Sequence, residues 1–169
     1  INNLDNASLE FIYNESLGFA EMYLNGVNVE KLIRSLEVSN LVSKVSAIPE
    51  VRRKLVAIQK EIGKNKAVVM DGRDIGTVVF TDAELKIFMT SSAETRAQRR
   101  FDELMQKGEK VSYKEVYTNV VERDRVDTTR KDSPLIKAES AIEIDNSELS
   151  KEKQFEIILK LVEEKLRDI

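Results

Sequence analysis

Residues 67–77 read Ala-Val-Val-Met-Asp-Gly-Arg-Asp-Ile-Gly-Thr, a short apolar run that ends abruptly in charged residues and glycines. The unbroken run Ala67–Met70 predicts a strand buried on both faces, as in a parallel sheet. Ligands of open α/β sheets bind beyond the carboxyl ends of such strands. At that end Asp71 can organise a metal ion through its waters, and Arg73 can hold a phosphate with two hydrogen bonds. We therefore expect a ligand site here; the alternative is a polar turn with solvated side chains.

The composition of the chain excludes several kinds of chemistry. The 169 residues are enough for one domain, with or without a small subdomain, and the net charge of −3 argues against a general nucleic-acid binder. There is no histidine and no cysteine, which excludes thiol nucleophiles, histidine bases, Cys/His zinc sites and disulfides. The remaining carboxylates, arginines, lysines and hydroxyls suit phosphoryl transfer, which depends on positioning and charge neutralisation. The lack of cysteine fits a cytoplasmic protein, and no apolar run has membrane-spanning length.

The first 62 residues predict a small antiparallel meander followed by two helices. Residues 9–14 and 19–24 are candidate strands, and Asn25-Gly26 is a strong signal for a tight hairpin because both positions need a positive φ. Helical spacing then runs over residues 28–62, with a break near Pro49. From spacing alone, Arg52 and its basic neighbours are expected on a solvated helix face.

The remainder of the chain predicts further strands and helices. Leu85–Met89 and Ala141–Ile144 are candidate strands. Capping boxes predict helix starts at Ser91-x-x-Glu94 and at Ser112-x-x-Glu115. A last amphipathic helix is predicted over about residues 150–166, and the face expected to lie in the core carries Phe155, Ile158, Leu159 and Val162.

Two groups of arginines leave alternatives open. Arg96 and Arg100 share one helix face, where an anion between them would offset their repulsion; the alternative is a solvated face with Arg99 paired to Glu103. Residues 122–135 carry dense alternating charge, which predicts an exposed segment. That segment is either a mobile lid whose arginines close over phosphates or a plain surface linker.

The whole motif at residues 69–80, Val-Met-Asp-Gly-Arg-Asp-Ile-Gly-Thr-Val-Val-Phe, resembles the signature of bacterial cytidylate kinases, which phosphorylate CMP and dCMP with ATP. The resemblance covers the chain from about Glu21 onward. It implies a cytoplasmic kinase that uses Mg²⁺ with ATP as cosubstrate. Its partners would be the nucleotides CMP, dCMP and ATP, with neither nucleic acid nor membrane.

The resemblance also implies a fold, that of α/β P-loop nucleoside monophosphate kinases with strand order 2-3-1-4-5. Residues 67–70, 85–89 and 141–144 would be strands 3, 4 and 5, and the β-rich start would be a small antiparallel insert. Residues 1–62 would form the CMP-binding region and residues 63–109 core strands and a helix. Residues 110–135 would form the lid, and residues 136–169 the last core strand and helix.

The resemblance assigns roles to individual residues. Ser43 and Arg52 would contact the cytosine, and Asp74 would accept a hydrogen bond from its exocyclic amine, which uracil lacks. Arg73 would hold the CMP phosphate. Asp71 would act through the water shell of magnesium, with no side chain as a direct metal ligand. Further roles fall to arginines and one lid acid: Arg96 and Arg100 would contact ATP, Arg123 and Arg130 would neutralise the transferring phosphoryl group, and Asp127 would orient the lid or contact the ribose.

One feature of the family is absent from the sequence. The chain contains no Gly-x-x-x-x-Gly-Lys-[Ser/Thr], the loop that cradles the phosphates of ATP. With Ile1 in place of a starting methionine, this predicts a kinase without its N-terminal part, hence without strands 1 and 2, and inactive by itself. The N-terminal segment or another chain would then complete the sheet. The alternatives are a CMP-binding module without catalysis and a charged α/β domain that binds a protein partner.

Overall fold

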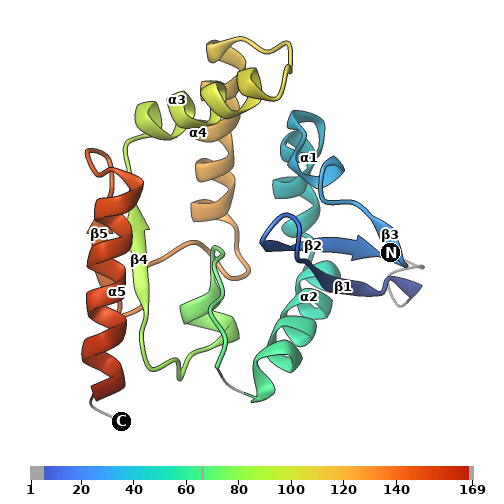
Figure 1. Cartoon of the computed structure of the whole chain (residues 1–169). Helices are drawn as coiled ribbons and strands as arrows, with labels where there is room; N and C mark the ends of the chain where they lie inside the picture. Colours follow the sequence, from blue (N-terminus) through green and yellow to red (C-terminus); the bar gives the residue numbers. More distant parts are fainter. Residues whose placement is uncertain (1–5, 66, 168–169) are drawn as a thin grey trace. The chain divides into compact units, whose positions relative to one another are not determined.

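The computed structural model describes residues 6–65 and 67–167 (Figure 1). The chain divides into two compact units, Ile1–Ile62 and Gly63–Ile169, and each unit has its own small sheet. The fold class is therefore mixed α/β, with one antiparallel and one parallel sheet. No helix in the described ranges combines the length and the apolar character that crossing a membrane requires.

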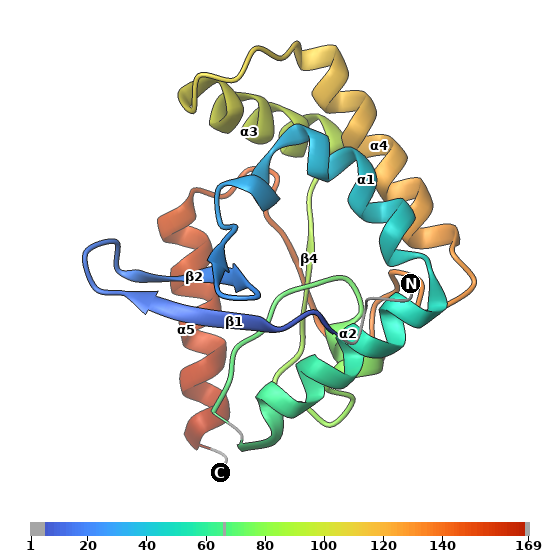
Figure 2. The same cartoon turned by 90° about the vertical axis from the view of Figure 1, so that its right-hand side faces the viewer.

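The first unit begins with an antiparallel sheet in the order β1-β2-β3. Its strands are β1 (Leu9–Asn14), β2 (Phe19–Leu24) and β3 (Val27–Asn28). Figure 2 shows β1 and β2 side by side as a hairpin, with Leu9 opposite Leu24. Between β2 and β3, Asn25 and Gly26 have φ of 50° and 78°. The meander and its tight Asn-Gly turn are thus confirmed.

Two α-helices complete the first unit, as predicted, although they begin later than residue 28. They are α1 (Leu36–Ser46) and α2 (Pro49–Ile62), preceded by the 3₁₀ turn η2 (Leu32–Arg34). In the segment before η2, the buried carboxylate of Glu30 accepts hydrogen bonds from the Met22 amide and from Arg34. The solvated position expected for Arg52 is wrong: its side chain is buried and donates to the carbonyl of Ser46 at 3.2 Å.

The second unit holds the parallel sheet. Its regular elements are β4 (Ile87–Thr90), α3 (Ala93–Gln106), α4 (Tyr113–Thr129), β5 (Ile142–Asp145) and α5 (Lys151–Arg167), with short turns η3 (Gly63–Asn65) and η4 (Ile75–Val79). β4 and β5 pair in parallel, with Ile87 opposite Ile142. This confirms the strands predicted at 85–89 and 141–144 and their adjacency.

The strand predicted at Ala67–Met70 is not formed. These residues have no regular secondary structure, and Val69 is fully exposed. An apolar run becomes a buried strand only where neighbouring strands satisfy its amides and carbonyls, and no strand of the described residues pairs with this one. The run leads into η4, a single π-helical turn in which the Asp74 carbonyl accepts the amide of Val78 at 2.9 Å.

Helices α3 and α4 pack against each other around Ala97, Leu104 and Val116, which are almost fully buried. The capping box at Ser112 and Glu115 is confirmed. The cap predicted at Ser91 is one residue early, because Ser92 accepts from the Thr95 amide at 3.0 Å.

Two predictions about exposure are wrong for individual residues. Residues up to Thr129 of the charged segment continue α4, and Asp127 within it is only 2% exposed. Conversely, α5 turns Phe155 and Leu159 outward, 63% and 41% exposed. Two strands of four residues each offer too little surface to cover the apolar face of a 17-residue helix.

Candidate active site

A buried carboxylate surrounded by three arginines lies in the second unit. Asp127 of α4 accepts a hydrogen bond from Arg73 Nε at 2.9 Å and from Arg130 Nη1 at 3.2 Å. The Nε of Arg123, one helical turn before Asp127, lies 3.8 Å from the same carboxylate. We call these four residues the Asp127 cluster. It brings together three of the four residues predicted to act in catalysis and the predicted phosphate ligand Arg73.

The Asp127 cluster carries excess positive charge, because one carboxylate faces three guanidinium groups. Burial lowers the pKa of Arg123, and the nearby charge of Arg73 lowers it further. The buried Arg123 Nε makes no hydrogen bond among the described residues. The Arg123 and Arg73 side chains are 35% and 39% exposed, whereas that of Arg130 is 6% exposed. The arrangement can therefore accept an anion from the side of Arg73 and Arg123.

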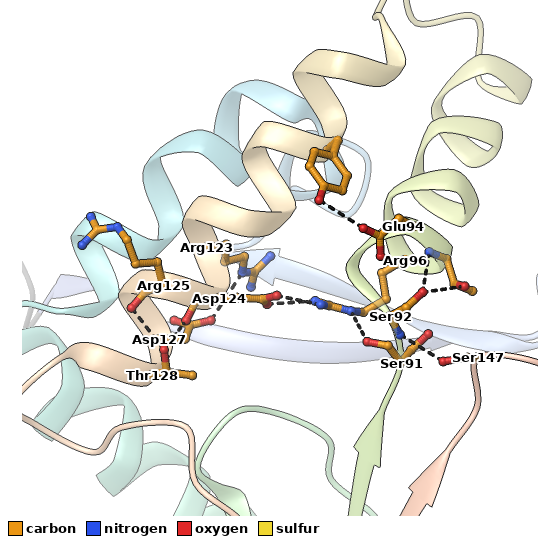
Figure 3. A network of polar contacts seen from close by, with 12 residues as sticks. Ser91, Ser92, Glu94, Arg96, Arg123, Asp124, Arg125, Asp127, Thr128 and Ser147 are labelled. Carbon is orange, nitrogen blue, oxygen red and sulfur yellow. Dashed lines mark hydrogen bonds and ion pairs between the residues drawn. The ribbon is translucent and has the colours of Figure 1, made fainter.

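A second ion pair joins α3 to α4 beside this cluster. Figure 3 shows Arg96 reaching from α3 toward Asp124, whose two oxygens accept its Nη1 and Nη2 at 2.8 and 2.6 Å. The Nε of Arg96 donates to the carbonyl of Ser91, just after β4, at 3.1 Å. The hydrogen bonds to Asp124 raise the pKa of Arg96. Asp124 is a site residue that sequence reasoning missed, since nothing in the local pattern separates it from the other charges of residues 122–132.

The ion pairs of the arginines that follow Arg96 on α3 also differ from those expected for a solvated face. Arg100, not Arg99, pairs with Glu103, at 2.7 Å. Arg99 instead hydrogen-bonds residues that follow β5, beginning with the carbonyl of Asn146 at 2.7 Å. A surface hollow of about 570 Å³ lies along this face, lined by Arg96, Arg99, Arg100, Asp102, Glu103, Gln106 and Lys151.

The remaining predicted site residues belong to other segments of the chain. Asp74 is buried at the start of η4, and Asp71 is exposed in the preceding segment. Arg52 and Ser43 belong to the first unit, on α2 and α1, and the Ser43 side chain lies outside the described part of the structure. Within the described residues, no group of three or more acidic side chains could by itself hold a metal ion.

The parallel sheet and the arginine-rich site around a buried carboxylate are compatible with the binding of phosphates, and comparison with known proteins gives the class and family of the chain. The class is that of nucleotide-binding kinases with the P-loop fold. A family model described as cytidylate kinase matches residues 2–164. The chain therefore belongs to the cytidylate kinase family, as its motif at residues 69–80 predicted.

Individual relatives agree with the family match. The chain is 68% identical over 162 residues to a cytidylate kinase of Flavobacterium johnsoniae, covering 96% of this chain and 70% of the relative. It is 65% identical to a cytidylate kinase of Flavobacterium psychrophilum, covering 96% and 72%. A cytidylate kinase of Parabacteroides distasonis is 53% identical over 152 residues, covering 90% and 66%.

Proposed function

We propose that this chain takes part in the transfer of the γ-phosphoryl group of ATP to CMP or dCMP, giving CDP or dCDP. The observation that carries the proposal is the buried Asp127 with three arginines around it. Catalysis of phosphoryl transfer consists mainly of positioning and of neutralising charge on the phosphoryl oxygens. The named relatives, all cytidylate kinases, support CMP as the acceptor.

Each residue of the Asp127 cluster has a separate role in the proposed reaction. Arg73 holds the CMP phosphate. When the phosphate binds, the guanidinium of Arg73 either exchanges its hydrogen bond to Asp127 for one to the phosphate or bonds both groups. Arg123 and Arg130 neutralise the transferring group. Asp127 keeps the three guanidiniums together and orients the lid, residues 110–135, or contacts the ribose. Arg130, the most buried of the three, is held by Asp127 and by the Ser133 carbonyl at 2.8 Å, so it moves least.

The base and the donor nucleotide are bound by other residues. Ser43 and Arg52, in the CMP-binding region of residues 1–62, contact the cytosine, and Asp74 accepts from its amine. Arg96 and Arg100 supply positive charge to ATP. The exposed carboxylate of Asp71 would hold magnesium through its waters, and the ion would neutralise charge on the ATP phosphates.

The function requires the phosphate-cradling motif, which the 169 residues do not contain. The test is a coupled assay with MgATP and CMP on two proteins. One is this chain, and the other is this chain joined to the part of the Flavobacterium johnsoniae relative that the match leaves uncovered, which we call the completed chain. We expect CMP phosphorylation only by the completed chain. Phosphorylation by the 169 residues alone would refute the need for the motif, and an inactive but folded completed chain would refute the proposed function.

A second candidate function is CMP binding without catalysis, which the absence of the phosphate-cradling motif favours for this chain on its own. Calorimetric titration of the 169 residues with CMP, UMP and ATP tests it. Saturable CMP binding without ATP binding would support a binding module. Binding of none of the three would leave a protein-interaction domain as the alternative.

A further inference from the structure

We propose that Arg99 is a positioning residue that shapes the loop between β5 and α5, residues 146–150, into one wall of the ATP site. This inference rests on the proposed function, because it concerns the donor side of the same reaction. It assigns a role to an arginine that lies between Arg96 and Arg100 in the sequence but contacts different partners. We call residues 146–150 the β5–α5 loop.

The contacts of Arg99 with the loop are numerous. Its Nη1 donates to the Asn146 side-chain oxygen at 3.0 Å, and its Nη2 donates to the Asn146 carbonyl at 2.7 Å. The carbonyls of Ser147 and Leu149 each lie 3.4 Å from the same Nη2. One planar guanidinium thus faces four acceptor atoms, which belong to Asn146, Ser147 and Leu149. Only the fork geometry of arginine serves such a set, and a lysine ammonium does not reproduce it.

Further bonds tie the β5–α5 loop to the end of β4. The Ser147 hydroxyl accepts the Ser92 amide at 3.0 Å and donates to Asp145 at 2.6 Å. The Asn146 amide donates to the Thr90 carbonyl at 2.9 Å, which extends the parallel ladder by one bond. The start of α3 and the loop after β5 are therefore one hydrogen-bonded assembly at the carboxyl edge of the sheet, where ligands of α/β proteins bind.

Arg96 and Arg99 each donate hydrogen bonds to carbonyl groups that follow one strand of the parallel sheet. Arg96 bonds the Ser91 carbonyl after β4, and Arg99 bonds the carbonyls after β5. The two arginines also line the same hollow, together with Lys151 at the start of α5. Since Arg96 and Arg100 are the proposed ATP contacts, the loop that Arg99 holds faces the donor nucleotide rather than CMP.

The test uses steady-state kinetics of the completed chain with Arg99→Ala, Arg99→Lys and Asn146→Ala. We expect Arg99→Ala to raise the KM for ATP about tenfold, the loss given by one or two hydrogen bonds, with the KM for CMP unchanged. Arg99→Lys should be nearly as impaired, because it keeps the charge but loses the fork. The double variant Arg99→Ala/Asn146→Ala should be little worse than Arg99→Ala alone. Arg167→Ala is the matched control: Arg167 is an exposed arginine of α5 whose Nε donates to the carbonyl of Glu163 on its own helix.

The outcomes distinguish the positioning role of Arg99 from direct charge attraction to ATP and from a purely structural role. Full rescue by Arg99→Lys would overturn the proposal in favour of direct charge attraction to ATP. Equal rises in both KM values, or a lowered melting temperature with unchanged KM values, would overturn it in favour of a structural role. An inactive completed chain before any substitution counts against the proposed function instead. In that case hydrogen exchange of the amides of residues 146–149 in the 169-residue chain still tests the contact. Faster exchange in Arg99→Ala than in Arg167→Ala would support it, and equal exchange would overturn it.

Discussion

Arg73 and Asp127, 54 positions apart in the sequence, meet through a 2.9 Å hydrogen bond in the second unit. The side chain of Asp127 is 3% exposed and that of Arg73 is 39% exposed. The pair joins the segment after the apolar run to helix α4. A phosphate at Arg73 would therefore lie directly beside Arg123 and Arg130, which share the same carboxylate.

Replacing Asp127 by alanine should destabilise the 169-residue chain. The change leaves three guanidiniums together without their carboxylate, and breaking a buried ion pair typically costs about 3 kcal/mol or more. Because Arg73 and Arg123 are more than a third exposed, we expect the low end, about 3 kcal/mol. Urea unfolding measures the loss. Glu122→Ala, which removes an exposed partner of Arg125, is the control and should cost at most about 1 kcal/mol.

The same variant allows a test of anion binding. Inorganic sulfate should stabilise Asp127→Ala more than the unchanged chain, because the anion replaces the lost carboxylate among the arginines. Equal stabilisation of both proteins by sulfate would contradict an anion site at the Asp127 cluster.

Arg123→Ala and Arg130→Ala should separate catalysis from stability. In the completed chain both should lower kcat, by ~10³-fold if each neutralises charge in the transition state. Arg130→Ala should also lower the melting temperature, because its side chain is 6% exposed and bonds both Asp127 and Ser133. Arg123→Ala should melt almost as the unchanged protein does, since its Nε makes no hydrogen bond within the described residues. If both variants lose stability and activity in equal measure, the arginines are structural.

Local patterns predicted much of the fold. The Asn25-Gly26 hairpin, the break before Pro49 and the Ser112 capping box are properties of a few adjacent residues, and the structure confirms them. The prediction of a buried strand at residues 67–70 was wrong, because the burial of a strand depends on neighbouring strands distant in the sequence, and a local pattern does not show them. The prediction that Phe155 of α5 lies in the core was wrong for the same reason.

In the candidate site, too, local features could be predicted from the sequence, whereas contacts between distant residues could not. The resemblance to cytidylate kinases named Arg73, Arg123, Asp127 and Arg130 as individual site residues, but the residue pattern itself could not show that they meet. Asp124 and Arg99 were missed because their partners lie 28 and 47 or more positions away. Whether a charge in a dense charged segment is buried depends on such tertiary contacts, so the expectation of exposure there was wrong for Asp127.

The capping box of α4 should make stability depend on pH in the acid range. Hydrogen bonds from the backbone amide and the hydroxyl of Ser112 lower the pKa of Glu115 below 4.5. A carboxylate whose pKa is lowered by folding contributes stability at higher pH, and this contribution is lost as the pH falls below 4.5 through the folded pKa. Glu115→Gln should therefore reduce the acid sensitivity of the melting temperature. Carboxyl NMR titration gives the pKa directly. Ser112→Ala removes the hydroxyl but keeps the backbone amide, so it should return the pKa only part of the way toward the ordinary value. An unchanged pKa in Ser112→Ala would contradict a contribution from the Ser112 hydroxyl.

Asp74 should determine the choice of base. Its side chain is buried, where an acceptor discriminates well between the amine of cytosine and the carbonyl oxygen of uracil, because a mismatch leaves buried polar groups unsatisfied. In the completed chain, Asp74→Ala should weaken CMP use by about 1–3 kcal/mol and shrink the preference for CMP over UMP, with the KM for ATP unchanged. The ratio of kcat/KM values for the two nucleotides is the measurement. Asp71→Ala is the matched control: Asp71 is an exposed acid three residues earlier, and its proposed role is with magnesium, so its loss should lower turnover without changing the ratio. A variant of Asp74 that keeps the original preference would show that another residue reads the base.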